Sequence, residues 1–268
     1  SALDRANPAS AIGGARKSGK VYLFAGTYTI AANLSIYNNT TLSGAGTSTV
    51  LQLADLDAAA SLITNNDTTS GTSIIIENMK LDGRNDLNTA GTQYGLYFDG
   101  LGGGTGATAR AGVKVDSVTV TRFRTANIYL TASNYANFNK VTSQASGGSG
   151  AYLISSSNHN SFTGNTFYGN ATNGMTINGS TYNAIAGNTF ANNTADGLQL
   201  TNGSSYNSVT GNTSDTNGSD GYEITDGGTS GSSYNSLENN VAEGNTNAGI
   251  NSNNSNSLSL VGNLIRNN

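Results

Sequence analysis

The sequence contains no cysteine and no tryptophan, a single proline, and few charged residues for its length of 268 residues. The absence of cysteine excludes both a disulfide framework and a thiolate metal site. Charged residues make up 10% of the chain, whereas glycine alone occurs 35 times, and asparagine, serine and threonine fill much of the remainder. Because these residues favour turns over helix interiors, the composition predicts short strands and many turns.

Long hydrophobic runs are also missing. No stretch approaches the ~20 apolar residues that a membrane-spanning helix needs, and Ser1 opens no signal-peptide pattern. We therefore expect a soluble chain without a membrane span, from which any export signal has been removed. The net charge of −4 argues against a nucleic-acid partner.

The charges that are present are unevenly distributed. The segment from Arg110 to Lys140 holds five basic residues and one acid, Asp116. The segment from Val141 to Ile265 holds seven acids and neither lysine nor arginine. Such an arrangement can steer an anionic ligand toward the middle of the molecule, although a solvated polar surface explains the same charges.

A repeat of about two dozen residues dominates the second half of the chain. Gly-Asn or Asn-Asn pairs recur with spacings of 23, 24, 28 and 23 residues, and their second asparagines are Asn165, Asn188, Asn212, Asn240 and Asn263. A second asparagine column has a similar period and contains Asn160, Asn183, Asn207, Asn235 and Asn256. Because identical amides can hydrogen-bond along a column, both columns indicate turns that stack in register.

Three apolar columns share this period. The first contains Phe162, Ile185, Val209, Leu237 and Leu258 and extends back to Val141 and Val118. The second contains Phe167, Phe190 and Ile265, is joined by Phe123, and is weakened at Ser214 and Ala242. The third contains Leu130, Leu153, Ile177, Leu200 and Ile224. Three inward columns predict three short strands per coil, stacked at the ~4.8 Å spacing of paired strands around a shared core.

These patterns predict an all-β fold, a single-stranded right-handed parallel β-helix of about ten coils that forms one domain over residues 1–268. We expect a short Ala-rich helix over residues 9–20 to cap the first coil, because exposed sheet edges need cover. Irregular coils are expected over residues 21–135 and regular coils of about 21–28 residues over residues 136–268. A β-propeller is disfavoured because its blades need about 40 residues.

The only histidine of the chain lies in an aromatic column. Tyr182, Tyr206 and Tyr234 precede the second asparagine column, and His159 occupies the matching position one coil earlier, with Phe138 before it. Stacking on neighbouring rings explains this histidine without a catalytic role. A catalytic role is the alternative.

Several segments resemble a known superfamily. The segments "VYLFAGTYTI", "LSGAG" and "IENMKLDGRNDLNTAG", followed by asparagine-rich coils, resemble the pectin-lyase-like β-helix superfamily and, within it, the catalytic module of mannuronan C5-epimerases. The later coils are similar to the generic repeat of NosD-type periplasmic proteins. The resemblance covers roughly residues 9–268 and implies an extracellular or cell-surface protein with an acidic polysaccharide as its partner.

The same resemblance places the epimerase catalytic stretch, Asp-Pro-His-Glu with a preceding tyrosine, on residues 126–132. The aspartate position holds Tyr129, the histidine position holds Thr131, the tyrosine position holds Ala126, and the lysine position lies near Thr92. Abstraction of a proton next to a carboxylate needs a base, an acid and a cation. Epimerisation by this family's machinery is therefore not expected.

No cofactor is predicted. Between Asp116 and Asp196 the chain has no acid, so adjacent coils there offer neither the carboxylate pair of a hydrolase nor the carboxylates that hold calcium in a lyase. Further along, Asp196, Asp215, Asp220 and Asp226 could coordinate calcium, but they lie beside glycine and asparagine in turns. Ordinary solvation of those turns explains them.

An outward surface is the feature that points to a ligand. On the strand of the third apolar column, alternation places the following residues outside: Tyr97, Tyr129, Tyr152, Thr176, Gln199, Glu223 and Asn251. Three tyrosines one coil apart predict a flat aromatic strip suited to sugars. The basic residues near it in the chain, which can pair with carboxylates, are Lys80, Arg84, Arg122 and Arg124. The alternative explanation is the general preference of strands for tyrosine.

Three functions fit these features. The first is a module that binds acidic polysaccharide along the tyrosine and arginine residues without catalysis. The second is a structural surface or fibre subunit that self-associates through an open sheet edge. The third is a lyase-like or epimerase-like enzyme with nonstandard residues, in which Lys140 or Tyr129 acts as the base and His159 as the acid.

Overall fold

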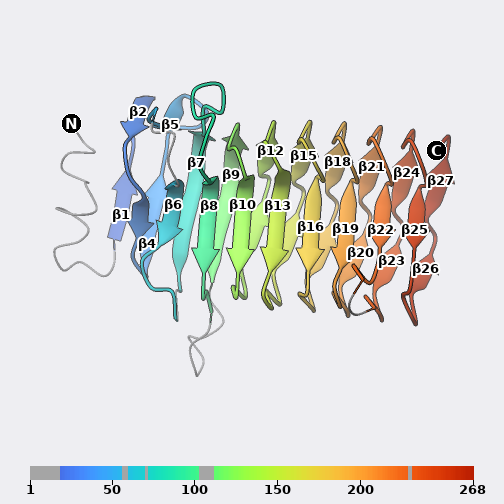
Figure 1. Ribbon diagram of the computed structural model, residues 1–268. Coiled ribbons are helices and arrows are strands. Elements are labelled where there is room, and N and C mark those ends of the chain that lie inside the picture. Colours follow the sequence, from blue (N-terminus) through green and yellow to red (C-terminus); the bar gives the residue numbers. More distant parts are fainter. Residues whose placement is uncertain (1–18, 56–59, 70–71, 103–111, 229–230) are drawn as a thin grey trace.

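The computed structural model describes residues 19–55, 60–69, 72–102, 112–228 and 231–268. In this part of the chain 27 strands form, their pairings are parallel, and no helix is present. Successive coils stack along one axis from β1 to β27 (Figure 1). The fold is therefore a parallel β-solenoid of about ten turns, which confirms the predicted architecture.

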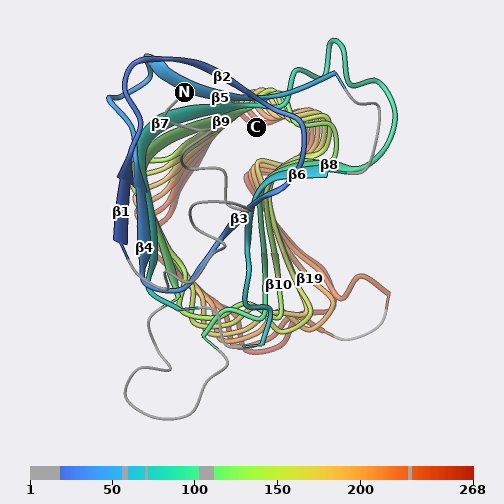
Figure 2. The same cartoon turned by 90° about the vertical axis from the view of Figure 1, so that its left-hand side faces the viewer.

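Each coil contributes strands to three faces of the solenoid (Figure 2). The first column consists of β1 (Gly19–Tyr22), β4 (Thr40–Ser43), the first halves of β7 (Ile74–Asp82) and β9 (Val113–Thr121), β11 (Asn137–Asn139), β14 (Ser161–Thr163), β17 (Ala184–Ala186), β20 (Ser208–Thr210), β23 (Ser236–Glu238) and β26 (Ser259–Val261). The second column consists of β2 (Gly26–Ile30), β5 (Thr49–Leu53), the second halves of β7 and β9, β12 (Thr142–Gln144), β15 (Thr166–Tyr168), β18 (Thr189–Ala191), β21 (Thr213–Asp215), β24 (Val241–Glu243) and β27 (Leu264–Arg266). Because β7 and β9 run through both columns, the two form one 18-stranded sheet.

The third column is a separate nine-stranded sheet. Its strands are β3 (Leu34–Ile36), β6 (Ala60–Asn65), β8 (Gln93–Asp99), β10 (Ala126–Thr131), β13 (Ser149–Ile154), β16 (Met175–Asn178), β19 (Leu198–Thr201), β22 (Tyr222–Ile224) and β25 (Ile250–Ser252). The apolar column predicted for this sheet is confirmed: Leu130, Leu153, Ile177, Leu200 and Ile224 are in register on neighbouring strands and buried. Strands this short cannot bury a core alone, so the stacked coils supply it together.

The first predicted apolar column is confirmed in its middle and wrong at its ends. Phe162, Ile185, Val209 and Leu237 are in register, but the preceding rungs hold Phe138 and Val115 rather than Val141 and Val118. The last rung holds Leu260 rather than Leu258. Val118 and Val141 instead lie at the corner between the two columns, in line with Asn165. That corner is buried, so an apolar residue there has the same sequence signature as one inside a strand.

The second predicted column is confirmed from Phe167 through Phe190, Ser214 and Ala242 to Ile265. Phe123 does not belong to it, because Val120 and Ser143 occupy the two preceding rungs. Phe123 lies in the turn after β9, where it is fully buried. Its ring fills the space that the missing side chains of Gly83 and Gly95 leave open.

Asparagine ladders hold three corners of each regular coil. The ladder Asn165–Asn188–Asn212–Asn240–Asn263 is confirmed, with side-chain amides bonded at 2.9–3.0 Å. The second ladder is confirmed for Asn160, Asn183, Asn207 and Asn235 but not for Asn256, because Leu258 stands on the next rung. A third ladder, which the sequence analysis missed, contains Asn170, Asn193, Asn217, Asn245 and Asn268.

The capping helix predicted over residues 9–20 is not supported. Residues 9–18 lie outside the described residues, and Gly19 and Lys20 begin strand β1. This strand pairs with β4, with Val21 opposite Leu42. Helix propensity is a weak preference that tertiary pairing overrides, and here the pairing with the next coil decides the conformation.

Candidate functional site

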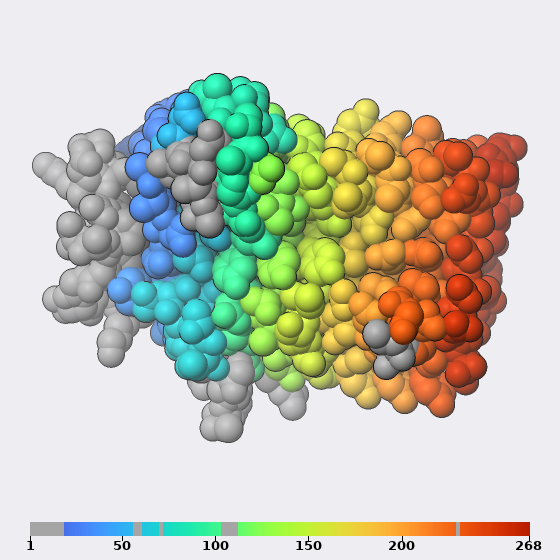
Figure 3. Space-filling model, viewed as in Figure 1, coloured from blue at the N-terminus to red at the C-terminus, as the bar shows by residue number. Residues whose placement is uncertain are grey.

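The outward face of the nine-stranded sheet carries the predicted row of side chains. Strand register places Tyr97, Tyr129 and Tyr152 next to one another on β8, β10 and β13. The row continues on the following strands with Thr176, Gln199, Glu223 and Asn251. Figure 3 shows the molecule from the side on which this sheet lies, with residues near 83–92 projecting above it.

The tyrosine rings stand on edge rather than lying flat. The ring centroids of Tyr97 and Tyr129 are 5.5 Å apart with planes within 5°, and those of Tyr129 and Tyr152 are 5.6 Å apart with planes within 6°. Each ring therefore covers the face of its neighbour. The row presents ring edges and phenol hydroxyls to a ligand, which corrects the flat strip predicted from the sequence.

Tyr94 also belongs to this cluster, although the sequence analysis missed it. Its ring centroid lies 4.6 Å from that of Tyr129 and 5.3 Å from that of Tyr97. Strict alternation places residues 94 and 97 on opposite faces of a strand, so period-two reasoning could not find it. We call Tyr94, Tyr97, Tyr129 and Tyr152 the tyrosine row.

The phenols of Tyr94, Tyr97 and Tyr129 are protonated at neutral pH. Burial, and then the neighbouring tyrosines, raises the pKa of Tyr129 to about 12. Burial also raises the pKa of Tyr94 and of Tyr97. These hydroxyls can donate and accept hydrogen bonds, as Tyr152 does when its hydroxyl accepts a bond of 2.9 Å from the Asn178 amide.

Two of the predicted basic residues are neutralised by acids. Arg122 donates two hydrogen bonds of 2.9 Å to the carboxylate of Asp82 and pairs with Asp86 at 3.0 Å. Lys80 pairs with Asp82 at 3.1 Å. Burial raises the pKa of Asp82, but the hydrogen bonds from Arg122, the Arg84 N–H and Lys80 outweigh it and lower that pKa overall. This cluster therefore adds little net charge to the face.

Arg124 and Arg84 are the basic residues that keep their charge available. Arg124 is exposed, and its guanidinium donates to the carbonyl oxygen of Gly91 at 2.5 Å. It precedes β10 by two residues, and the first residue of β10, Ala126, lies opposite Tyr94. In the described part of the chain neither arginine forms an ion pair. Arg124 thus places positive charge at the start of β10, in the N-terminal half of the face.

The C-terminal half of the same face is acidic. Asp196 and Asp220 are 5% and 4% exposed, and Asp196 accepts the Asp220 N–H at 3.0 Å. Glu223 accepts a hydrogen bond of 2.6 Å from the Gln199 amide and lies within hydrogen-bonding reach of the Asp196 carboxyl. Burial, together with repulsion between the carboxylates, raises the pKa of Asp196 and of Glu223. Solvated turns therefore do not explain Asp196 and Asp220.

The three catalytic candidates lie on different parts of the coil. Tyr129 is on β10 of the nine-stranded sheet, and Lys140 is in the turn between β11 and β12 of the other sheet. His159 stacks between Tyr135 and Tyr182 at 5.2 Å from each, which confirms its place in an aromatic column and replaces Phe138 by Tyr135 as its neighbour. The structure does not bring these three side chains into one site.

Neither a metal cluster nor a helix able to span a membrane appears among the described residues. No group of three or more histidine or acidic side chains in these ranges is arranged to hold a metal ion. No helix in the same ranges has the length and apolarity needed to cross a membrane.

A comparison with protein families identifies the class of this solenoid. The family described as "Right handed beta helix region" matches residues 126–268, slightly more than half of the chain. The chain therefore belongs to the right-handed β-helix family. A comparison with curated protein sequences found no significant match.

Solved structures with the same fold include an alginate epimerase, a mannuronan C-5 epimerase and a phage tailspike protein. A mutant of the periplasmic alginate epimerase AlgG superposes with a TM-score of 0.68 and 16% identity, over 91% of this chain and 60% of that protein. The mannuronan C-5 epimerase AlgE4 A-module of Azotobacter vinelandii gives 0.55 and 17%, over 99% and 91%. Tailspike protein 2 of the Escherichia coli O157:H7 bacteriophage CAB120 gives 0.63 and 15%, over 88% and 35%. These likenesses establish the fold.

Proposed function

We propose that this chain is a carbohydrate-binding β-helix that holds an acidic polysaccharide along the tyrosine row. The observation that carries the proposal is the tyrosine row, in which Tyr97, Tyr129 and Tyr152 are stacked and Tyr94 is tilted against Tyr129, with the exposed Arg124 two residues before β10. Aromatic edges and phenol hydroxyls suit hydroxyl-rich ligands, and guanidinium groups match the carboxylates of uronate sugars. Neighbours in fold whose names specify alginate and mannuronan epimerases support the same class of ligand.

The charges on the face determine which part of it takes the polymer. Arg84 and Arg124 attract an anionic chain to the half that carries the tyrosine row, whereas the cluster of Asp196, Asp220 and Glu223 repels it from the other half. The bound segment then spans β8, β10 and β13. Opposite charges at the two ends of one face also give the polymer a fixed position along the solenoid.

Binding without catalysis by the epimerase machinery is part of the proposal. The positions that correspond to the family's aspartate and histidine hold Tyr129 and Thr131, and a phenol with a pKa of about 12 is a poor base at neutral pH. We also propose an extracellular or periplasmic location, in keeping with the periplasmic epimerase and the phage tailspike that share the fold.

Calorimetric titration with oligomers of mannuronate and galacturonate tests this function. The double variant Tyr129→Ala, Arg124→Ala should bind at least tenfold more weakly, because it removes the central ring and the bordering charge. The matched control Tyr168→Ala, Arg266→Ala changes an exposed tyrosine and an exposed arginine on the second column and should bind like the wild type. Equal affinities of the wild type and the Tyr129, Arg124 double variant would rule out this face. Absorbance of unsaturated sugar ends, followed in the same samples, reports any lyase activity.

A further inference from the structure

A second aromatic stack lies at the corner between the nine-stranded sheet and the first column, away from the tyrosine row. It contains Tyr135, His159, Tyr182, Tyr206 and Tyr234 on five successive coils, with ring centroids 5.0–5.2 Å apart and planes within 10°. All five residues have a left-handed backbone with φ of 57–59°. This conformation is unfavourable for bulky residues, so the stacking of their rings compensates for local strain.

The stack stops at Tyr135 for a steric reason. Strand register places Gly112 on the preceding rung and Ser73 on the rung before it. A Cβ atom on Gly112 would lie 2.6 Å from the carbonyl oxygens of both Asn134 and Tyr135, so the chain cannot place a ring on this rung. One face of Tyr135 is stacked on His159, and no ring of the described residues stacks on the other.

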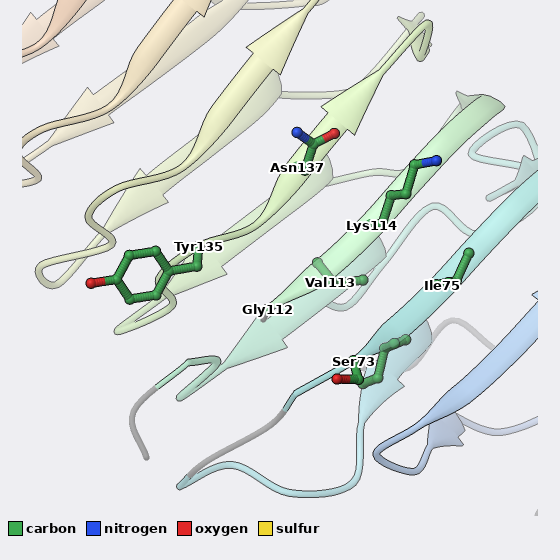
Figure 4. A pocket seen from close by; sticks show the side chains of 8 residues that line it. Ser73, Ile75, Gly112, Val113, Lys114, Tyr135 and Asn137 are labelled. Atoms are coloured by element: carbon green, nitrogen blue, oxygen red, sulfur yellow. The ribbon is translucent and has the colours of Figure 1, made fainter. Parts of the chain in front are cut away.

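A cavity of about 450 Å³ occupies the position of the missing ring. Figure 4 shows Tyr135, Gly112 and Ser73 near the beginnings of three neighbouring strands, with Lys114 and Asn137 further along β9 and β11. This volume is at the lower end of the range for small-ligand sites. The residues that line it include the polar Ser73, Lys114 and Asn137 and the apolar Ile74, Ile75 and Val113 of β7 and β9.

We propose that this cavity binds one uncharged pyranose ring, which takes the place of the missing ring and stacks on the free face of Tyr135. The C–H face of a sugar fits an aromatic face, and its hydroxyls can bond to Ser73, Asn137 and Lys114, which a purely aromatic ligand could not do. Lys114 pairs with Asp116 at 2.9 Å, so its charge is already balanced and does not demand an acidic sugar. The site lies on a different face from the tyrosine row and takes a different ligand, so it is independent of the proposed function.

Saturation-transfer NMR with the methyl glycosides of glucose, mannose and galactose tests the site on the full chain. The wild type should bind at least one of the three probes, Tyr135→Ala should abolish the signal, and Asn137→Ala should weaken binding roughly tenfold. Tyr234→Ala is the matched control. Tyr234 is the ring at the other end of the stack, has the same left-handed backbone and, like Tyr135, stacks on a single ring. The Tyr234→Ala variant should bind the probes with the affinity of the wild type. The tyrosine-row variant Tyr129→Ala, Arg124→Ala should also bind these probes like the wild type.

Three results would overturn the assignment. The first is that the wild type binds none of the probes. The second is that Tyr135→Ala and Tyr234→Ala have the same effect, which would trace any loss to the stability of the stack; circular dichroism of both variants checks that they fold alike. The third is that methyl glucuronide binds more tightly than methyl glucoside, which would show that Lys114 selects an acid.

Discussion

Replacement of one ladder residue, Asn188→Ala, should destabilise the whole solenoid severely. The Asn188 amide donates to the carbonyl oxygen of Phe162 at 2.9 Å and to Asn212 Oδ1 at 3.0 Å. Its own Oδ1 accepts two bonds of 2.9 Å from Asn165, one from the backbone N–H and one from the side chain. The side chain is 1% exposed, so water cannot easily replace these partners.

The magnitude follows from the number of bonds that are lost. Each buried hydrogen bond contributes about 0.5–1.5 kcal/mol net, and an orphaned partner costs more. Four bonds therefore give a loss of about 4 kcal/mol in the free energy of unfolding. For a chain of this size, 1 kcal/mol lowers Tm by about 2–4 °C, so we expect a decrease of about 8–16 °C.

Urea denaturation followed by circular dichroism, with a thermal scan, measures this loss. The control is Asn247→Ala, which removes an amide that bonds to Ser219 Oγ at 3.1 Å on the surface; surface substitutions change stability by about 0.5 kcal/mol or less. If Asn188→Ala and Asn247→Ala lower stability by the same small amount, the ladder is not a major source of stability.

Three further predictions concern pH and packing. The folded-state pKa of Asp196 and of Glu223 is raised, so their contribution to stability is fully present below the unfolded-state pKa values of about 4 and is lost as pH rises through the folded-state values. The variant Glu223→Gln should therefore raise Tm at pH 8 more than at pH 4. Equal increases of Tm at the two pH values would contradict this prediction. Phe167→Ala, which removes a fully buried ring stacked 5.2 Å from Phe190, should cost about 3–5 kcal/mol in urea denaturation. Gly174→Ala should cost about 1–3 kcal/mol in the same assay, because its Cβ would lie 2.6 Å from the Gly197 carbonyl oxygen; wild-type stability would show that the coils can separate slightly.

The architecture could be predicted because each core column repeats once per coil. Spacing alone placed Leu130, Leu153 and Ile177 on neighbouring strands, and the structure agrees. Spacing could not separate a strand position from a buried corner, so Val118 and Val141 were misplaced. The helix expected over residues 9–20 rested on composition, and composition carries no information about the pairing of β1 with β4.

The candidate site was less accessible to sequence reasoning. The alternation of side chains along a strand predicts which residues point outward. The orientation of their rings depends on contacts between coils, so alternation could not predict the upright stacking of Tyr97, Tyr129 and Tyr152. The contact between Asp196 and Glu223 joins residues of adjacent coils, because strand register places Glu223 beside Gln199, three residues after Asp196. Counting acids along the chain could not show that they meet.

The asparagine ladders also govern how the length of this molecule can change. Several ladder amides donate both to a carbonyl oxygen of the preceding coil and to the asparagine of the following coil, as Asn188 does with Phe162 and Asn212. Removal of a whole turn would bring equivalent amides together again, whereas removal of half a turn would strand buried N–H groups at every corner it crosses. Shorter and longer relatives of this solenoid should therefore differ by complete turns, added or lost as indivisible units.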